Sequence, residues 1–172
     1  APLIQDRYTF LTYREYYQAI SGGSKFLKPP MLVSLDDASP IFMNENFGKI
    51  VNELGKFGIK GTLAVVTGDQ GRWNKRYLEQ LRSFANSGWE LAIHGKEHLN
   101  FPSLGYKELW EEIADCHQAL TAIDPSQEPT TLILPFGDYW RGRENVEIDE
   151  RIPKICRELD IIWIVGIKGG KE

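Results

Sequence analysis

The sequence predicts an α/β domain built on a parallel sheet. Between residues 31 and 167, short apolar runs typical of strands alternate with stretches whose apolar residues recur at helical spacing. Alternation of this kind favours parallel strands joined by right-handed helical crossovers. The strand-like runs are apolar at nearly every position, which indicates burial on both faces of the sheet.

The first half of the pattern contains two strands and two helices. The first strand is expected over residues 31–36 and the second over residues 63–66. A glycine closes each helical stretch, Gly58 after the first and Gly88 after the second, as is common at helix C-termini. The helical faces consist of Phe47, Ile50, Val51, Leu54 and Phe57, and of Tyr77, Leu78, Leu81, Phe84 and Ala85.

The second half repeats the alternation. Strands are expected over residues 89–93, 130–134 and 161–167. A long helix from Tyr106 to Ile123 should end before Pro125, because proline cannot continue a helix. A further helix carries Ile152, Ile155, Cys156 and Leu159 on one face. Residues 1–30 are less regular and are expected to form a leading helix and loop packed on the domain.

Length and composition are those of one globular domain, residues 1–172. A net charge of −4 without a basic cluster argues against a nucleic-acid partner. The longest apolar runs, such as residues 161–165, are far shorter than the roughly 20 residues of a membrane span. Cys116 and Cys156 are expected to be free, packed thiols. The chain starts at Ala1 rather than Met and shows no signal peptide, so a processed or longer precursor is left open.

Polar side chains mark the ends of two of the expected strands. Asp36 and Asp37 end the first strand, and His94 and His98 follow the third. Carboxylates and imidazoles are the ligands that a divalent metal of the zinc class prefers, and active sites of parallel α/β folds form at this edge. One aspartate can bind metal while the other takes a proton. The alternative, exposed histidines with helix-capping aspartates, is left open.

A third polar segment follows the fourth strand. The sequence Pro135-Phe136-Gly137 predicts a tight turn, which can present the backbone N–H of Phe136 toward a developing oxyanion. Tyr139 and Trp140 could offer flat apolar surface to a sugar ring. A purely structural turn with packed aromatic side chains is the alternative.

For four other polar or aromatic residues, a structural position is favoured over the alternative that they line or bind in the metal site. His117 falls on or beside the apolar stripe of the helix from residue 106, so a packed or half-buried histidine is expected rather than a third ligand. Asp69, Arg72 and Trp73 follow the second strand and are expected in a solvated loop.

Three segments together resemble the polysaccharide deacetylases, the NodB-homology group of carbohydrate esterase family four. They are Ser34-Leu35-Asp36-Asp37, the HGKEH segment at 94–98 and the Pro-Phe-Gly turn at 135–137, in the order and spacing of that family. The helix-to-strand link at 54–62 is also similar. The resemblance covers roughly residues 30 to 168.

The resemblance implies a distorted parallel (β/α) barrel, usually of seven strands. It implies a divalent metal, commonly zinc, bound by Asp37, His94 and His98, with Asp36 as the general base. The oxyanion would rest on the metal and on the N–H of Phe136. The implied reaction is the removal of acetate from an N-acetylated sugar or an O-acetylated glycan.

Pro135, Tyr139 and Trp140 are the candidate substrate-binding residues. The sequence departs from the family pattern at Gly95, where Ser or Thr is usual, and at Ile133, where Arg is usual. The late Leu-x-His segment that supplies the family's general acid is absent. Five strands do not close a barrel of seven, so we expect either a fragment or a short member. A partner subunit, as in a homo-oligomer, could then cover the open sheet edge.

Two other functions are compatible with these departures. Some relatives with glycine after the first histidine hydrolyse small amides or cyclic imides, which would suit a cytoplasmic enzyme. An envelope glycan as substrate would instead place the protein outside the membrane. A degenerate module that binds glycan or metal without catalysis is the third reading.

Overall fold

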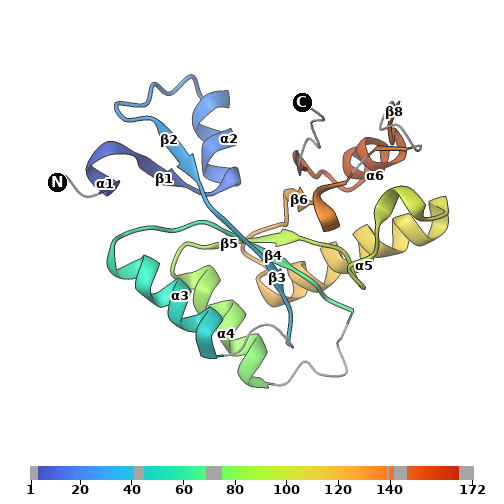
Figure 1. Cartoon of the computed structure of the whole chain (residues 1–172), viewed down its shortest axis with the longest axis horizontal. Coiled ribbons are helices and arrows are strands. Elements are labelled where there is room, and N and C mark those ends of the chain that lie inside the picture. The colour runs from blue at the N-terminus through green and yellow to red at the C-terminus, as the bar shows by residue number, and fades with distance from the viewer. Residues whose placement is uncertain (1–3, 41–44, 69–74, 139, 142–146, 167–172) are drawn as a thin grey trace.

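The protein is described by a computed structural model covering residues 4–40, 45–68, 75–138, 140–141 and 147–166 (Figure 1). Five parallel strands form its main sheet, in the spatial order β3-β4-β5-β6-β9. These strands are β3 Ser34–Ala38, β4 Thr62–Val65, β5 Glu90–Ile93, β6 Thr131–Ile133 and β9 Trp163–Val165. The prediction of an α/β fold with a parallel sheet is confirmed.

Helices separate the strands, as the periodicity predicts. They are α3 Glu45–Lys56, α4 Lys75–Asn86, α5 Tyr106–Ile123 and α6 Arg151–Glu158. In Figure 1, α3, α4 and α5 lie along one side of the sheet, and the N-terminal elements lie on the other. Strands β3 and β9 are the edges of the sheet among the described residues. In that part of the chain, no helix is long and apolar enough to span a bilayer.

The N-terminal region contains more structure than the expected helix and loop. It forms α1 Ile4–Arg7, β1 Thr9–Leu11 and α2 Tyr13–Ser21, and β1 pairs in parallel with β2 Pro30–Leu32. The two-stranded pairing was missed because a three-residue strand is too short to show a pattern. The chain also forms short turns η2 Phe101–Ser103 and η3 Pro135–Gly137, and the pair β7 Trp140–Arg141 and β8 Glu147–Ile148.

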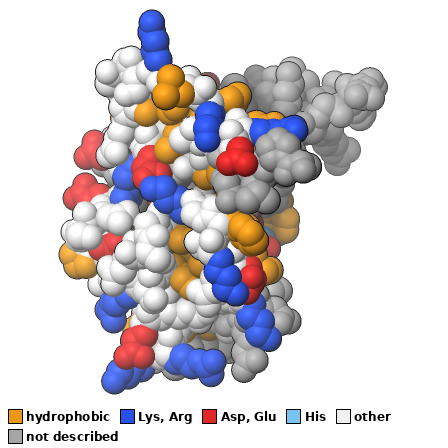
Figure 2. Space-filling model, turned by 90° about the vertical axis from the view of Figure 1, so that its left-hand side faces the viewer, with side chains coloured by type: hydrophobic (Ala, Val, Ile, Leu, Met, Phe, Trp, Pro, Cys, Tyr) orange, Lys and Arg blue, Asp and Glu red, His pale blue; other side chains and the backbone are white. Residues whose placement is uncertain are grey.

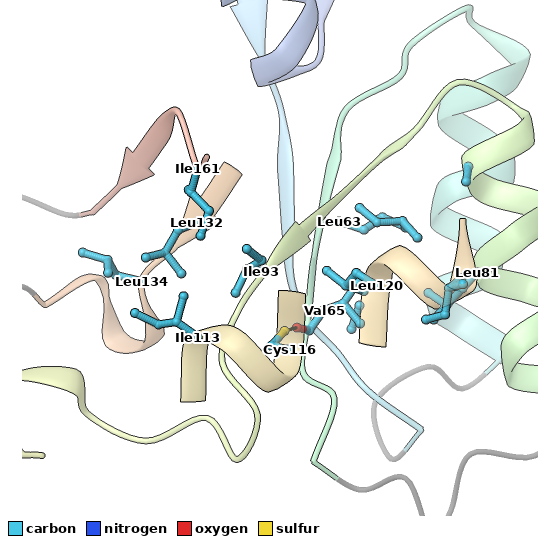
Figure 3. Close-up of a cluster of buried hydrophobic side chains, with 14 of the residues drawn as sticks. Leu63, Val65, Leu81, Ile93, Ile113, Cys116, Leu120, Leu132, Leu134 and Ile161 are labelled. Atoms are coloured by element: carbon cyan, nitrogen blue, oxygen red, sulfur yellow. Dashed lines mark hydrogen bonds between the residues drawn. The ribbon is translucent and has the colours of Figure 1, made fainter. Parts of the chain in front are cut away.

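The main hydrophobic core lies between the sheet and its helices. Figure 3 shows side chains of β4, β5 and β6, including Val65, Ile93 and Leu132, gathered against those of α5. The opposite face of the sheet carries a second, smaller cluster of Ala64, Ala92 and Ile133. Partly buried Tyr13 and Val165 pack against this cluster, and Ile133 and Val165 also line a cavity at this edge of the sheet.

The segment expected to be one buried strand over residues 31–36 is two strands, β2 and β3, separated by Val33. The prediction that the strand ends at Asp36 is wrong, because β3 continues through Ala38. Its register against β4 shifts between Leu35 and Ala38, so a bulge interrupts the strand. Asp37 has φ 61°, in the left-handed region. A bulge re-aims side chains and breaks the usual alternation, which brings Asp36 and Asp37 into the same cavity.

The surface around the N-terminal elements carries charges of both signs. Figure 2 shows lysine, arginine and acidic side chains interspersed on this face, between small separate apolar patches. On this face, the described residues do not form the basic stripe that nucleic-acid binding requires.

Candidate metal centre

Asp37, His94 and His98 come together at the carboxyl ends of β3 and β5. One potential ligand atom from each of the three lies within 4.8 Å of the others. The Oδ1 atom of Asp37 is 3.4 Å from Nε2 of His94 and 3.0 Å from Nε2 of His98. Two imidazole nitrogens and a carboxylate oxygen are a donor set suited to zinc and similar divalent ions.

The imidazole of His94 is buried, and one hydrogen bond fixes its orientation. Its Nδ1 lies 2.7 Å from the backbone carbonyl oxygen of Ile133 on β6. A carbonyl oxygen can only accept, so Nδ1 carries the proton and Nε2 of the neutral ring has a lone pair facing Asp37. A ligand histidine whose other nitrogen donates to a carbonyl is the usual arrangement in metal sites. The donor set therefore fits a divalent cation.

His98 lies at the mouth of the site and is partly exposed. Its backbone has φ 57°, and its ring lies 4.8 Å from that of His94 and 4.7 Å from that of Phe136. Burial, and then the neighbouring His94, lower the pKa of His98, while Asp37 opposes this shift. A lowered pKa favours the neutral imidazole, which is the form that binds metal.

The three side chains line a cavity of about 450 Å³. Its wall is formed by residues at the ends of β3, β5, β6 and β9, among them Ser34, Asp36, Leu134, Phe136 and Val165. Phe136 has φ 60° and an exposed ring, so three non-glycine lining residues, Asp37, His98 and Phe136, have left-handed backbones. Sparsely populated conformations of this kind cluster at functional sites.

Asp36 lies in the same cavity but outside the ligand cluster. Its side chain is exposed, and no lysine or arginine of the described ranges lies within ion-pair distance of it. The side chain of Ile133 is apolar and packs with Ala64 and Ala92. The orientation of Asp36 therefore depends on the bulge in β3 rather than on an ion pair.

The remaining predicted residues have different positions. His117 is half-buried on α5, near Glu128 and Asp160, as expected of a packed histidine. Pro135 is buried in η3 next to the cavity wall. Asp69, Arg72, Trp73 and Tyr139 lie outside the described residues, and so does the side chain of Trp140.

Sequence reasoning missed one residue that contacts the histidine segment. Glu112 on α5 is only 4% exposed, and both of its carboxylate oxygens accept from the backbone N–H of Glu97, at 3.1 and 3.0 Å. A signal was available, because Glu112 is three residues after Leu109 and four before Cys116, within the buried stripe of the helix. A carboxylate at such a position requires hydrogen-bond donors.

The sequence also matches a known protein family. Residues 24–149 match the family described as polysaccharide deacetylase, and this match covers most of the chain. The chain belongs to the polysaccharide deacetylase family. The family contains the NodB domain and corresponds to carbohydrate esterase family four, as the sequence resemblance predicts. No protein with a curated description matches the chain in sequence.

Solved structures share the fold. The Streptococcus pyogenes deacetylase PplD in complex with acetate superposes with a TM-score of 0.71 at 21% identity, over 91% of this chain and 64% of that one. A Streptomyces lividans family 4 carbohydrate esterase, also with acetate, gives 0.60 at 16% identity, over 78% and 61%. A Bacillus anthracis protein described as a CE4 family pseudoenzyme gives 0.57 at 22% identity, over 78% and 42%.

These similarities confirm the predicted fold, a parallel α/β architecture matching the distorted barrel of carbohydrate esterase family four. The chain spans less than two thirds of the length of these structures, at 64%, 61% and 42%. The prediction that residues 1–172 form a single catalytic domain remains a prediction.

Proposed function

We propose that this protein is a metal-dependent hydrolase that removes acetyl groups from N-acetylated or O-acetylated sugars. The observation that carries the proposal is the convergence of Asp37, His94 and His98 within 4.8 Å, in a cavity that also contains Asp36 and Phe136. Family membership supports the chemistry, and two structural relatives are described as complexes with acetate, the product of such a reaction.

Asp37, His94 and His98 would hold the divalent metal, which we propose to be zinc. A bound divalent cation supplies Lewis acidity, which makes a water more acidic and an acetyl carbonyl more electrophilic. The hydrogen bond from His94 to the carbonyl of Ile133 fixes the orientation of one ligand ring in the absence of metal. Asp37 needs no large movement, because its Oδ1 already lies 3.0 Å from Nε2 of His98.

Asp36 would act as the general base and take a proton from the attacking water on a carboxylate oxygen. It is one residue from Asp37, lines the same cavity and is exposed. An aspartate without an ion-pair partner among the described residues has its oxygens free for this role. The transferred proton would then be available to the departing amine or alcohol.

The turn η3 would stabilise negative charge on the acetyl oxygen through the backbone N–H of Phe136. Within this turn the N–H of Gly137 already donates to the carbonyl of Leu134 at 2.9 Å, and that of Asp138 to Pro135 at 3.4 Å. A fixed backbone donor suits a developing oxyanion. The exposed ring of Phe136, with Tyr139 and Trp140, would offer apolar surface to a sugar.

A second candidate function is binding without catalysis. Ile133 stands at the position where the family usually has arginine, and the Bacillus anthracis relative is described as a pseudoenzyme. Family membership alone therefore does not establish turnover. Hydrolysis of small amides or cyclic imides is the catalytic alternative, for which the same metal ligands would serve.

Two isosteric variants test the proposal. Asp36→Asn should keep the metal and lower acetate release by about 10²–10⁴-fold, because only the base is lost. Asp37→Asn should lose metal and activity together. Metal content should be measured on each protein. Product release should be measured with N-acetylglucosamine oligomers, acetylated xylan oligomers and cyclic imides as substrates. Turnover of the imide alone would support the amide hydrolase, and metal without any turnover would support the binding module.

A further inference from the structure

The segment of residues 95–99, which follows His94 and includes His98, belongs to no helix or strand. Two of its residues have left-handed backbones, Gly95 at φ 84° and His98 at φ 57°. Its backbone contacts the loop after β4, where the N–H of Thr67 donates to the carbonyl of Gly95 at 3.3 Å. Glycine adopts this backbone without strain, but His98 does not, and a strained residue keeps its conformation only when its surroundings hold it.

Glu112 reaches this segment from α5. The side chain is buried, and the backbone N–H of Glu97 donates to Oε1 at 3.1 Å and to Oε2 at 3.0 Å. Burial raises the pKa of Glu112, while the backbone N–H groups of Glu97, Lys96 and Leu99 oppose that shift. The buried carboxylate of Glu112 therefore accepts from the backbone of the segment between the two histidines, and charge-assisted hydrogen bonds of this kind stabilise a loop.

The carboxylate also fits closely against the backbone of Gly95. A Cβ atom at Gly95 would lie 2.9 Å from Oε2 of Glu112 and 3.3 Å from the ring of Phe101. Glu112 thus occupies the space beside the residue that directly follows His94. It contacts the histidine segment at Gly95 and at Glu97, between the two ligands.

We propose that Glu112 is a positioning residue for the metal centre, whose carboxylate holds residues 95–99 so that the imidazoles of His94 and His98 face Asp37. This inference rests on the proposed metal site. Without the carboxylate, the amide of Glu97 loses its acceptor and the left-handed turns lose their support. Residues that orient metal ligands in this way typically contribute 10–100-fold to metal affinity.

Two other carboxylates provide matched controls. Asp115, one turn further along α5, pairs with Lys96 of the same segment at 2.7 Å, but both side chains are partly exposed. An exposed ion pair contributes little. Glu90 is as buried as Glu112, at 2% exposed, but lies at the start of β5, where it accepts from Thr62 at 3.0 Å and Thr131 at 2.6 Å.

The test is a Zn²⁺ titration against a competing chelator, with backbone amide exchange of Glu97 measured on the metal-free proteins. We expect Glu112→Ala to weaken Zn²⁺ binding 10–100-fold and to speed exchange at Glu97. Glu112→Gln should be affected less, because its amide oxygen can still accept one N–H. Asp115→Asn and Glu90→Gln should bind Zn²⁺ within about 3-fold of the original chain, although Glu90→Gln should unfold more easily.

Unchanged Zn²⁺ affinity in folded Glu112→Ala and Glu112→Gln would overturn the inference. So would an equal loss of affinity in Glu90→Gln, since that would reveal a general effect of destabilisation. If the original chain binds no Zn²⁺, the proposed function fails, and amide exchange alone then tests whether Glu112 holds the segment. Faster exchange at Glu97 in the Glu112 variants than in Glu90→Gln would then support the holding role, and equal exchange would overturn it.

Discussion

The Nδ1 atom of His94 lies 2.7 Å from the carbonyl oxygen of Ile133. This bond joins the end of β5 to β6 and sets the tautomer of a buried imidazole. Because the acceptor is the backbone carbonyl of Ile133, residue 133 can have an apolar side chain and still orient His94. The lone pair of His94 Nε2 then lies 3.4 Å from a carboxylate oxygen of Asp37, a pairing that a cation between them would favour.

The first prediction concerns this tautomer. In the metal-free protein at neutral pH, His94 should carry its proton on Nδ1, because the carbonyl partner can only accept. Long-range ¹H–¹⁵N correlation spectra of the imidazole nitrogens report this directly. His117, which is half-buried on α5, serves as the reference ring. A protonated Nε2 on neutral His94 would contradict the assigned orientation.

The second prediction concerns Gly95. Gly95→Ala should destabilise the fold by about 1–3 kcal/mol, because φ 84° is strained for alanine and the new Cβ would lie 2.9 Å from Glu112. Gly55→Ala is the control, since no atom lies within 4 Å of a Cβ there and the residue is in α3. That change should stabilise by about 0.5–1 kcal/mol. Urea denaturation of both variants provides the comparison, and equal effects would contradict the structure.

The third prediction separates the backbone of Phe136 from its ring. Phe136 has φ 60°, and its exposed ring lies 4.7 Å from that of His98. Phe136→Gly keeps the N–H and suits the left-handed backbone, so kcat should be retained while KM for a sugar substrate rises. Phe136→Val should lower kcat as well, because a β-branched residue disfavours this conformation. Identical kinetics of the two variants would rule out the proposed division of roles.

The fourth prediction concerns the two cysteines. Burial raises the pKa of Cys116 to about 12 and that of Cys156 to about 12. Both thiols should therefore resist thiol reagents at pH 8 in the native protein and react only after unfolding. Unfolded thiols lose their protons above about pH 9 while the buried ones keep theirs. The free energy of unfolding should then fall as pH rises above 9, by up to about 1.4 kcal/mol per pH unit for each thiol. Fast labelling of native protein would contradict this burial.

Hydrophobic periodicity was sufficient to predict most of the fold. The helix from Tyr106 to Ile123 has the predicted limits because Pro125 and the regular apolar stripe define it. The strand ends also placed the aspartates and histidines at one edge. The bulge in β3 was not predictable, since nothing in the sequence Ser34-Leu35-Asp36-Asp37 distinguishes a bulged strand from a strand end.

The local path of the histidine segment was also beyond the sequence. Between His94 and His98 the structure has a loop with left-handed residues at Gly95 and His98, and of the two only glycine commonly adopts such a backbone. The hydrogen bonds between Glu112 and Glu97 depend on the packing of α5 against β5. This is a tertiary contact, which no local sequence pattern indicates.

The most direct test of the metal centre is the metal content and acetate release of the original chain, His98→Ala and His117→Ala. The chain has three histidines, and His117 lies outside the cluster of Asp37, His94 and His98. We predict one divalent metal per chain and turnover on N-acetylglucosamine oligomers for the original chain and His117→Ala, with both lost in His98→Ala. Equal metal binding and turnover in His98→Ala, or no metal in the original chain, would contradict the proposed centre.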